Sequence, residues 1–168
     1  MAAPLEQARA DGGLEGGEAA ADGGDVDAEA AGGGAEVAQA VGEASRAIEL
    51  TLDWVTQRQA FGATLWDKQA IRQRLAWRAA QVEAARALVY QTAWRDARGQ
   101  QVVKEVSMIK ALCGTLVNEV MYDCLQFHGG MGYIRGMAIE RMARDARIQA
   151  IGGGATEVML DEVAKRMA

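Results

Sequence analysis

Between Val102 and Phe127 an apolar side chain recurs every three or four residues, and this pattern constrains the fold more than any other feature. The spacing is that of one face of an α-helix. A helix of this length must bury that face against other elements, and no segment of the chain alternates polar and apolar residues as a strand would. The pattern therefore predicts an all-helical domain.

The same helical spacing occurs in other segments. They are Ala35–Arg58, Trp66–Arg98, Ala138–Arg147 and Thr156–Met167. Gly62 and Gly99 stand where the first two of these helices should stop, as glycine commonly does after a helix. Short loops between long helices favour antiparallel neighbours. We therefore expect an all-α fold, an antiparallel up-and-down four-helix-type bundle with short additional C-terminal helices.

Residues 1–34 differ in composition from the rest of the chain. They hold nine glycines, and eight acidic residues against the single Arg9. Such a segment has too little apolar surface to offset the entropy lost on ordering. We expect residues 1–34 to be a disordered Gly/Ala/acidic tail and residues 35–168 to form the helical domain.

Charge and hydropathy limit the possible classes of function. The formal net charge of −5 argues against a nucleic-acid-binding protein, although the first 34 residues carry most of the negative charge. No run of about 18 apolar residues predicts a membrane span, and the N-terminus lacks the basic and apolar regions of a secretory signal. The expectation is a soluble, cytoplasmic protein.

Cys113 and Cys124 both fall in the predicted helix Val102–Phe127. The helical rise places them on one face about 16 Å apart, which is too far for a disulfide. His128 is the single histidine and the only further soft ligand nearby. We therefore expect two buried thiols and no metal site.

The predicted helix Val102–Phe127 runs into Gly129, Gly130 and Gly132, and a second glycine cluster follows at Gly152–Gly154. A glycine pair in this position commonly caps a helix and forms a tight turn. Alternatively, the main chain passes close to a bulky ligand, because glycine accepts positive φ and leaves its N–H groups accessible.

A set of short motifs in fixed order bears on this choice. They are Arg58-Gln59-Ala60-Phe61-Gly62, Gln69, Ile109-Lys110-Ala111, Gln126-Phe127-His128-Gly129-Gly130-Met131-Gly132-Tyr133, Glu140-Arg141, Arg144-Asp145-Ala146-Arg147 and Ile151-Gly152-Gly153-Gly154-Ala155-Thr156-Glu157-Val158-Met159. In this order and spacing the motifs resemble the C-terminal helical domain of acyl-CoA dehydrogenases. The resemblance covers roughly residues 36–168 and does not include the N-terminal and β-domains of that family.

The resemblance implies flavin-dependent oxidation of an acyl-CoA thioester to the trans-2-enoyl-CoA. In that family a carboxylate removes the α-proton, a hydride passes to FAD, and an electron-transfer flavoprotein accepts the electrons. The FAD lies across a subunit interface, where the helical bundle of one subunit holds the adenine and pyrophosphate end of its neighbour's cofactor. The implied partners are therefore acyl-CoA, the electron-transfer flavoprotein and further subunits of a homo- or hetero-oligomer, a dimer or tetramer.

The cofactor-binding residues that the resemblance implies are Arg58, Phe61, Gln69, Gln126, Gly129, Gly130 and Glu157. Arg58 would bind the pyrophosphate, and a guanidinium has the paired donors that suit a phosphate. Phe61 would pack on the adenine side, and Glu157 would lie toward the adenosine end. Apart from the resemblance, Arg58 also fits a cation at a helix C-terminus, and Phe61 also fits a core residue.

The catalytic carboxylate has no clear position in the sequence. Many family members carry it in the loop before the last helix, where this chain has Gly153, and a second group takes it from the first helix, where this chain has Gly32. Glu36 is one helical turn beyond Gly32 and could reach the same face, and Glu29 lies nearly a turn before it. A general base must come within about 3 Å of the proton that it removes, which the sequence alone does not show.

The resemblance leaves three possible functions. In the first, the chain is the C-terminal FAD-binding and oligomerisation portion of a flavin-dependent acyl-CoA dehydrogenase, completed by domains from a partner or a neighbouring gene. Alternatively, it is a non-catalytic, degenerate structural partner subunit of a complete dehydrogenase. The third possibility is a helical interaction module in which the motifs serve only the fold. In each case we expect the isolated chain to lack a complete active site.

Overall fold

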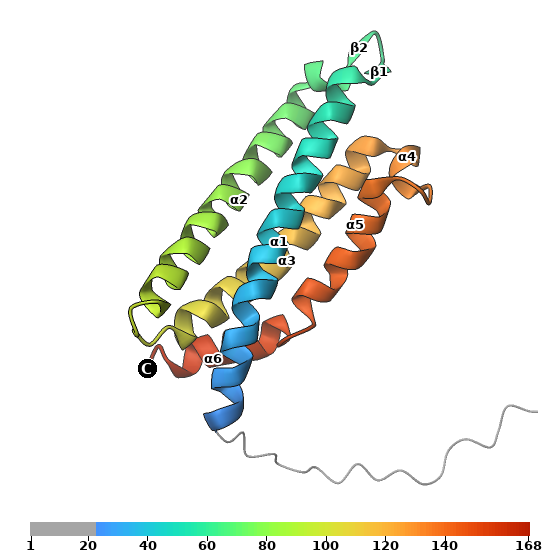
Figure 1. The fold of residues 1–168 in the computed structure, drawn as a ribbon. Coiled ribbons are helices and arrows are strands. Elements are labelled where there is room, and N and C mark those ends of the chain that lie inside the picture. Colours follow the sequence, from blue (N-terminus) through green and yellow to red (C-terminus); the bar gives the residue numbers. More distant parts are fainter. Residues whose placement is uncertain (1–22) are drawn as a thin grey trace, which may run out of the picture.

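The computed structural model describes residues 23–168, which form an antiparallel helical bundle (Figure 1). Three long helices build it: α1 (Gly23–Gln57), α2 (Gln69–Asp96) and α3 (Val103–His128). The shorter α5 (Ala138–Ala146) packs against α1 and α3. The predicted all-α bundle is confirmed.

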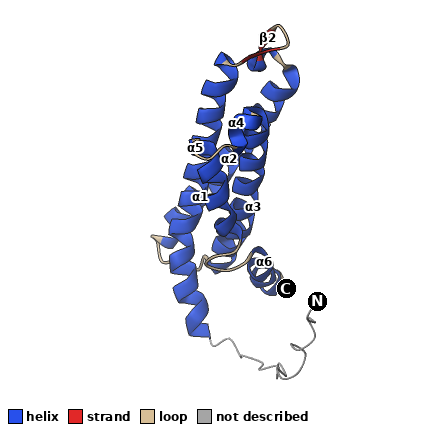
Figure 2. Cartoon of the chain, turned by 90° about the vertical axis from the view of Figure 1, so that its right-hand side faces the viewer, coloured by secondary structure: helices blue, strands red, loops and turns tan. Residues whose placement is uncertain are grey.

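Short elements connect the helices. They are the antiparallel strands β1 (Gln59–Ala60) and β2 (Ala63–Thr64), the 3-10 helix η1 (Leu65–Asp67), the one-turn helix α4 (Gly130–Tyr133), the 3-10 helix η2 (Arg147–Ala150) and the last helix α6 (Thr156–Lys165). The β-hairpin lies at one end of the bundle and α6 at the opposite end (Figure 2). The chain therefore has two separate ends at which loops can form sites.

The contact between α1 and α3 forms the centre of the core. Val37, Ala44 and Val55 of α1 are almost completely buried, as are Val117 and Val120 of α3. Small and β-branched side chains let the two helices approach closely, and burial of their apolar faces supplies most of the favourable free energy of folding. The apolar spacing that predicted these helices is thus the spacing of the core.

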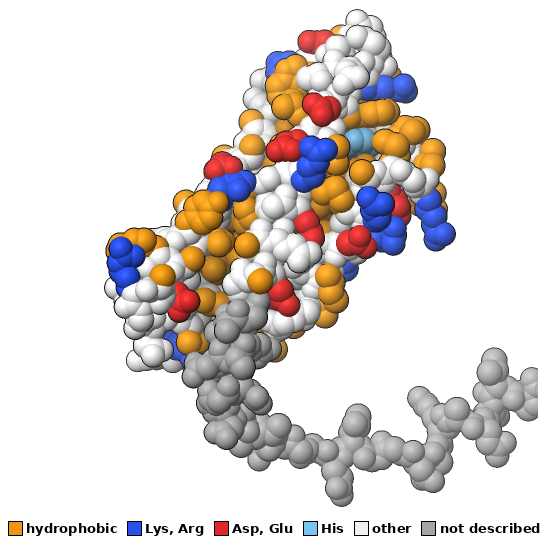
Figure 3. All heavy atoms as spheres, viewed as in Figure 1, with side chains coloured by type: hydrophobic (Ala, Val, Ile, Leu, Met, Phe, Trp, Pro, Cys, Tyr) orange, Lys and Arg blue, Asp and Glu red, His pale blue; other side chains and the backbone are white. Residues whose placement is uncertain are grey.

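Helix α2 buries less apolar surface than α1 and α3. Leu75, Val82 and Ala85 face the core, whereas Trp77 and Trp94 are exposed. Figure 3 shows hydrophobic side chains on the outer surface of the bundle, interspersed with charged ones. The outer side of α2 therefore carries exposed aromatic side chains.

A buried ion network joins α2 to α3. The Nε atoms of Arg78 and Arg74 donate hydrogen bonds to one carboxylate oxygen of Asp123, at 2.6 Å and 2.7 Å. Arg78 also pairs with Glu119. Burial acts to raise the pKa of Asp123, but the hydrogen bonds from the two arginines outweigh it and lower that pKa. The network thus holds a charged group inside the bundle because each charge has a partner.

The start of α1 differs from the prediction. The helix begins at Gly23 and not at Ala35, so residues 23–34, which we assigned to the disordered tail, continue the helix, and Gly32 lies within it. The three alanines and Glu29 between Asp25 and Ala31 have high helix propensity, which offsets the cost of the glycines. The first 22 residues of the predicted tail lie outside the described residues.

Within residues 23–168 no helix is both long enough and apolar enough to cross a membrane. The same residues contain no group of three or more His, Cys, Asp or Glu side chains arranged to hold a metal ion. Cys113 and Cys124 are free and buried, as predicted, and burial raises the pKa of each thiol to about 11.

Candidate cofactor site

A pocket of about 620 Å³ lies where the C-terminal ends of α1 and α3 meet the β-hairpin. Its lining residues are Trp54, Arg58, Ala60, Leu65, Ile71, Gln126, Phe127, His128, Gly129, Gly130, Met131 and Ile134. We call it the Arg58 pocket. It brings together four of the seven predicted cofactor residues, Arg58, Gln126, Gly129 and Gly130, from two segments that are far apart in the sequence.

The glycine turn forms one wall of the Arg58 pocket. Helix α3 ends at His128 and is capped by Gly129, whose φ of 58° is positive. The N–H of Gly129 donates to the carbonyl of Gln126 at 3.1 Å. A Cβ added to Gly129 or Gly130 would meet no atom within 4 Å. The chain itself therefore leaves the space over both glycines open to a ligand.

Gly132, by contrast, is required by packing. A Cβ at this buried position would lie 2.7 Å from the carbonyl oxygen of Leu125 and 3.1 Å from the Cβ of His128. The turn can fold back onto α3 only because this residue has no side chain. The two explanations of the glycines thus apply to different positions, packing to Gly132 and access to Gly130.

Two aromatic rings hold the ends of α1 and α3 together beside the pocket. Trp54 stacks on His128 with ring centroids 5.2 Å apart, and its indole N–H donates to the carbonyl of Phe127 at 3.2 Å. His128 is buried, and Nδ1 donates to the carbonyl of Cys124 at 2.8 Å. Burial lowers the pKa of His128, so the neutral imidazole is favoured.

Arg58 is available for an anionic ligand. It lies just beyond the end of α1, with its guanidinium carbon 5.9 Å from the centroid of the Trp54 ring. No ion pair within the described part of the chain includes Arg58. Its charge-assisted donors can therefore bind a phosphate group in the pocket.

Phe61 and Gln69 do not line the Arg58 pocket. Phe61 occupies the tip of the β-hairpin with 94% of its surface exposed and a φ of 56°, which is unusual for a residue other than glycine. Gln69 is exposed at the start of α2. Neither side chain can contact a ligand that lies inside the Arg58 pocket. Each can contact a ligand or a neighbouring subunit only on the outer surface of the chain.

Glu157 lies at a different site. It is exposed at the beginning of α6 and lines a pocket with Arg147, Thr156 and Tyr122, none of which borders the Arg58 pocket. The helix α6 is at the end of the bundle opposite to the hairpin (Figure 2). The structure therefore separates Glu157 from the other predicted cofactor residues.

The loop before α6 contains an unexpected contact with Glu36. The φ of Gly153 is 60°, and a Cβ on this residue would lie 2.6 Å from Oε1 of Glu36 and closer still to Oε2. Oε2 also accepts a hydrogen bond from Nζ of Lys110 at 2.5 Å. The carboxylate of Glu36 thus fills the space that a side chain at position 153 would enter.

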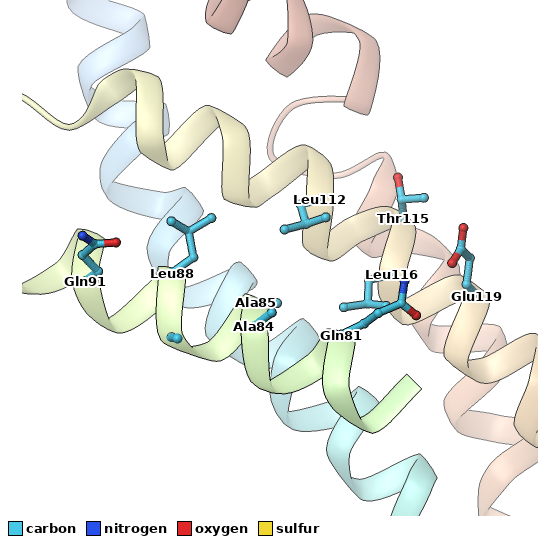
Figure 4. A pocket seen from close by; sticks show the side chains of 10 residues that line it. Gln81, Ala84, Ala85, Leu88, Gln91, Leu112, Thr115, Leu116 and Glu119 are labelled. Atoms are coloured by element: carbon cyan, nitrogen blue, oxygen red, sulfur yellow. The ribbon is translucent and has the colours of Figure 1, made fainter. Parts of the chain in front are cut away.

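A further groove of about 600 Å³ runs between α2 and α3 (Figure 4). Leu88 of α2 and Leu112 and Leu116 of α3 lie along it, with Gln81 and Glu119 at one end. It contains none of the predicted site residues. Its lining is mainly aliphatic, which suits packing against another apolar surface better than binding a charged cofactor.

Sequence reasoning gave no role in these sites to three of their residues: Trp54, His128 and Lys110. The first is one helical turn before Arg58, and the second immediately precedes the glycine pair, so both positions could have been inferred from spacing. Nothing in the local sequence indicates that Lys110 would meet Glu36, because that contact depends on the tertiary fold.

Comparison with known proteins identifies the family of the chain. A family model described as the C-terminal domain of acyl-CoA dehydrogenase matches residues 34–168. The short/branched chain specific acyl-CoA dehydrogenase of Bos taurus is 33% identical over 128 residues, which cover 76% of this chain and 30% of that protein. The CarC subunit of the caffeyl-CoA reductase-Etf complex of Acetobacterium woodii is 36% identical over 121 residues, covering 72% and 32%.

The fold is also similar to solved structures of this kind. A probable acyl-CoA dehydrogenase from Mycobacterium abscessus superimposes with a TM-score of 0.83 at 38% identity, covering 86% of this chain and 38% of that one. The chain therefore belongs to the acyl-CoA dehydrogenase family, within its C-terminal helical domain. It spans about a third of the length of the curated relatives described above.

Proposed function

We propose that this chain supplies the FAD-binding and oligomer-forming helical portion of a flavin-dependent acyl-CoA dehydrogenase. The assembly would convert an acyl-CoA thioester to the 2-enoyl-CoA, with the remaining domains provided by polypeptide outside residues 1–168, from a partner chain or a neighbouring gene. The observation that carries the proposal is the Arg58 pocket, because Arg58, Gln126 and the open glycine pair converge there from separate helices.

The residues of the Arg58 pocket fit the adenine and pyrophosphate end of FAD. Arg58 would hold the pyrophosphate through its guanidinium, while Gln126 and the N–H groups near Gly129 and Gly130 would contact the cofactor at close range. Phe61 would add an apolar contact from the hairpin tip. When bound, FAD supplies the acceptor for the hydride.

Gln69 and Glu157 are predicted to contact the cofactor outside this pocket. Because Glu157 lies at the other end of the bundle, it fits an assembly in which FAD is shared between subunits and each bundle meets more than one cofactor. Exposed aromatic residues on α2, such as Trp77 and Trp94, provide apolar surface for the contacts between subunits.

Glu36 is the candidate for the catalytic base, since its carboxylate lies against Gly153 in the loop before α6. In the proposed reaction the C–H bond at the α-carbon breaks and the proton goes to this carboxylate. FAD, when bound, would supply the acceptor for the β-hydrogen and its electron pair, so that a double bond would form between the two carbons. Glu36 would thus take the place of a carboxylate that the loop itself does not contain.

The name of the A. woodii relative places that protein in a complex with an electron-transfer flavoprotein. By analogy we propose an electron-transfer flavoprotein as the electron acceptor of this assembly. We also propose that the assembly is cytoplasmic.

A second function is favoured by the surroundings of Glu36. Its carboxylate is already paired with Lys110, and the loop offers only glycine at position 153. A chain of this kind could bind a complete dehydrogenase as a non-catalytic structural subunit. Flavin retention without any effect of Glu36→Gln on turnover would support this function over the first.

Replacing Arg58 tests the proposed function. The chain is mixed with a candidate partner that contains the N-terminal and β-domains, and the retained FAD is measured by its absorbance after gel filtration. Loss of a charge-assisted hydrogen bond should weaken FAD retention by about 10- to 100-fold in Arg58→Ala. Arg46→Ala is the matched control, because Arg46 makes an exposed ion pair with Glu49 away from the pocket. Equal retention by both variants would refute the pyrophosphate assignment.

A further inference from the structure

Lys110 is a buried cation whose place in the fold has no explanation in core packing. Only 4% of its side chain is exposed, about two turns into α3. Its Nζ donates to Oε2 of Glu36 at 2.5 Å and to the carbonyl of Gln149 at 3.3 Å. Burying an ammonium group is unfavourable by several kcal/mol unless it is well paired, so an apolar residue would suit a purely structural position better.

The backbones of α3 and η2 approach each other closely beside Lys110. Gly114, one turn along α3, lets η2 approach so that a Cβ there would lie 2.7 Å from the carbonyl oxygen of Gln149. That approach brings the carbonyl of Gln149 within reach of Lys110. The ammonium group therefore connects α1, through Glu36, with the segment that leads into the loop of Gly153.

The ion pair fixes only part of the Glu36 carboxylate. Lys110 binds Oε2, and among the described residues no hydrogen bond reaches Oε1. Both oxygens lie over the backbone of Gly153, where the left-handed φ and the absent Cβ leave room for them. The Glu36 side chain is partly exposed at 39%, so without Lys110 it could turn toward solvent.

We propose that Lys110 is a positioning residue that holds the carboxylate of Glu36 over Gly153 with Oε1 free to accept a proton. The inference rests on the proposed function of Glu36 as the base. Lys110 itself contacts neither substrate nor cofactor in this arrangement. Glycine is needed at position 153 because the carboxylate from α1 occupies the space of its side chain.

Thermal unfolding of the isolated chain tests the positioning directly. Gly153→Ala is introduced into the parent chain, into Glu36→Ala and into Lys110→Met. The strain of an alanine at positive φ is common to all three, whereas the clash with the carboxylate occurs only where Glu36 is held in place. Gly153→Ala should therefore lower the Tm by about 2–4 °C more in the parent chain than in the other two backgrounds.

An equal Tm shift in the parent and Lys110→Met backgrounds would overturn the proposal, because Lys110 would then not hold the carboxylate. If Lys110→Met does not fold, Glu36→Gln serves as the second background, since it keeps the size of the side chain and removes its charge. Lys104→Met is the matched control on the same helix, where Nζ only donates to the carbonyl of Arg166; it should leave the Gly153→Ala shift unchanged.

A second experiment measures the steady-state kinetics of a flavin-loaded complex. Misplacing a base by about 1 Å can cost on the order of 100-fold in rate, so Lys110→Met should lower kcat by about 10- to 100-fold with little change in KM. A change in KM alone would contradict a positioning role. Because the unfolding experiment needs no flavin, its result stands apart from that of the Arg58 experiment: failed FAD binding refutes the proposed function, and unchanged Tm shifts refute the role of Lys110.

Discussion

Gly130 and Gly132 are two residues apart in the glycine turn, but only Gly132 is required by the packing of the chain. Gly130 is exposed, its φ is not positive, and a Cβ there would meet open space. Gly132 is buried against the carbonyl of Leu125. A glycine that the chain does not need for its own packing, next to an arginine without an ion-pair partner in the described structure, is what a ligand-facing turn should contain.

This difference gives a prediction for two alanine substitutions. Gly130→Ala should change the free energy of unfolding by no more than about 0.5 kcal/mol, whereas Gly132→Ala should lower it by about 1–3 kcal/mol through the clash with Leu125 and His128. Denaturant unfolding of the isolated chain measures both. In the flavin-loaded complex Gly130→Ala should nevertheless weaken FAD retention, and a large loss of stability in this variant would contradict the open space seen over Gly130.

His128 should make the stability of the chain depend on pH. Its pKa is lowered by burial, so below about pH 6.5 the unfolded state binds a proton that the folded state resists. Stability is therefore full above this pH and falls as the pH decreases toward the folded-state pKa. Carboxylates with lowered pKa values, such as Asp123, change the stability with pH only below about pH 4, where the unfolded chain begins to protonate them.

The variant His128→Phe keeps an aromatic ring beside Trp54 and removes the only histidine of the chain. Urea unfolding midpoints measured between pH 7 and pH 5 should decrease in the parent chain and stay nearly constant in the variant. The same decrease in both proteins would show that His128 is not the responsible group. The absolute stability of the variant also changes, so the slope with pH is the informative quantity.

At the scale of helices, the packing of α2 depends more on ion pairs than the packing of α1 against α3 does. Its apolar contact with the core is modest, and Arg74 and Arg78 tie it to Asp123 of α3. Partnered charges inside a bundle contribute little relative to apolar residues, but the loss of one partner leaves the other buried and unpaired. The position of α2 is therefore sensitive to this network.

Asp123→Asn should lower the free energy of unfolding by about 3 kcal/mol, because Arg78 is left buried with only Glu119 as a charged partner. The matched control is Glu49→Gln, which breaks an exposed pair with Arg46 and should cost about 0–1 kcal/mol. Chemical unfolding of the two variants compares them. Similar losses in both would mean that the buried network does not hold α2 in place.

Over the whole molecule, the positions of the helices followed from local patterns. The predicted end of the second helix and the span of Val102–Phe127 agree closely with α2 and α3, because apolar spacing reports the face that each helix buries. The predicted start of α1 at Ala35 is too late, because the glycine-rich composition before it indicated disorder. The helix in fact begins at Gly23, and the alanines in residues 23–34 favour it. Propensity alone could not weigh these opposing preferences.

The candidate site was predictable where its residues belong to compact motifs. Arg58, Gln126, Gly129 and Gly130 were identified from their order in the sequence, and the fold brings them to one pocket. Glu157, from an equally recognisable motif, lies at the opposite end of the bundle. Motif order alone does not encode distance, because the direction of each helix decides which ends meet.

The sequence by itself determined the approximate spans of the helices after residue 35, since these depend on residues within a few turns of one another, and the family, through the order and spacing of its motifs. Only the tertiary structure decided that Trp54 stacks on His128 and that Glu36, held by Lys110, lies over Gly153. These contacts join segments that are distant along the chain. Their geometry is set by how α1 packs against α3 and by how η2 follows α5, which no local pattern specifies.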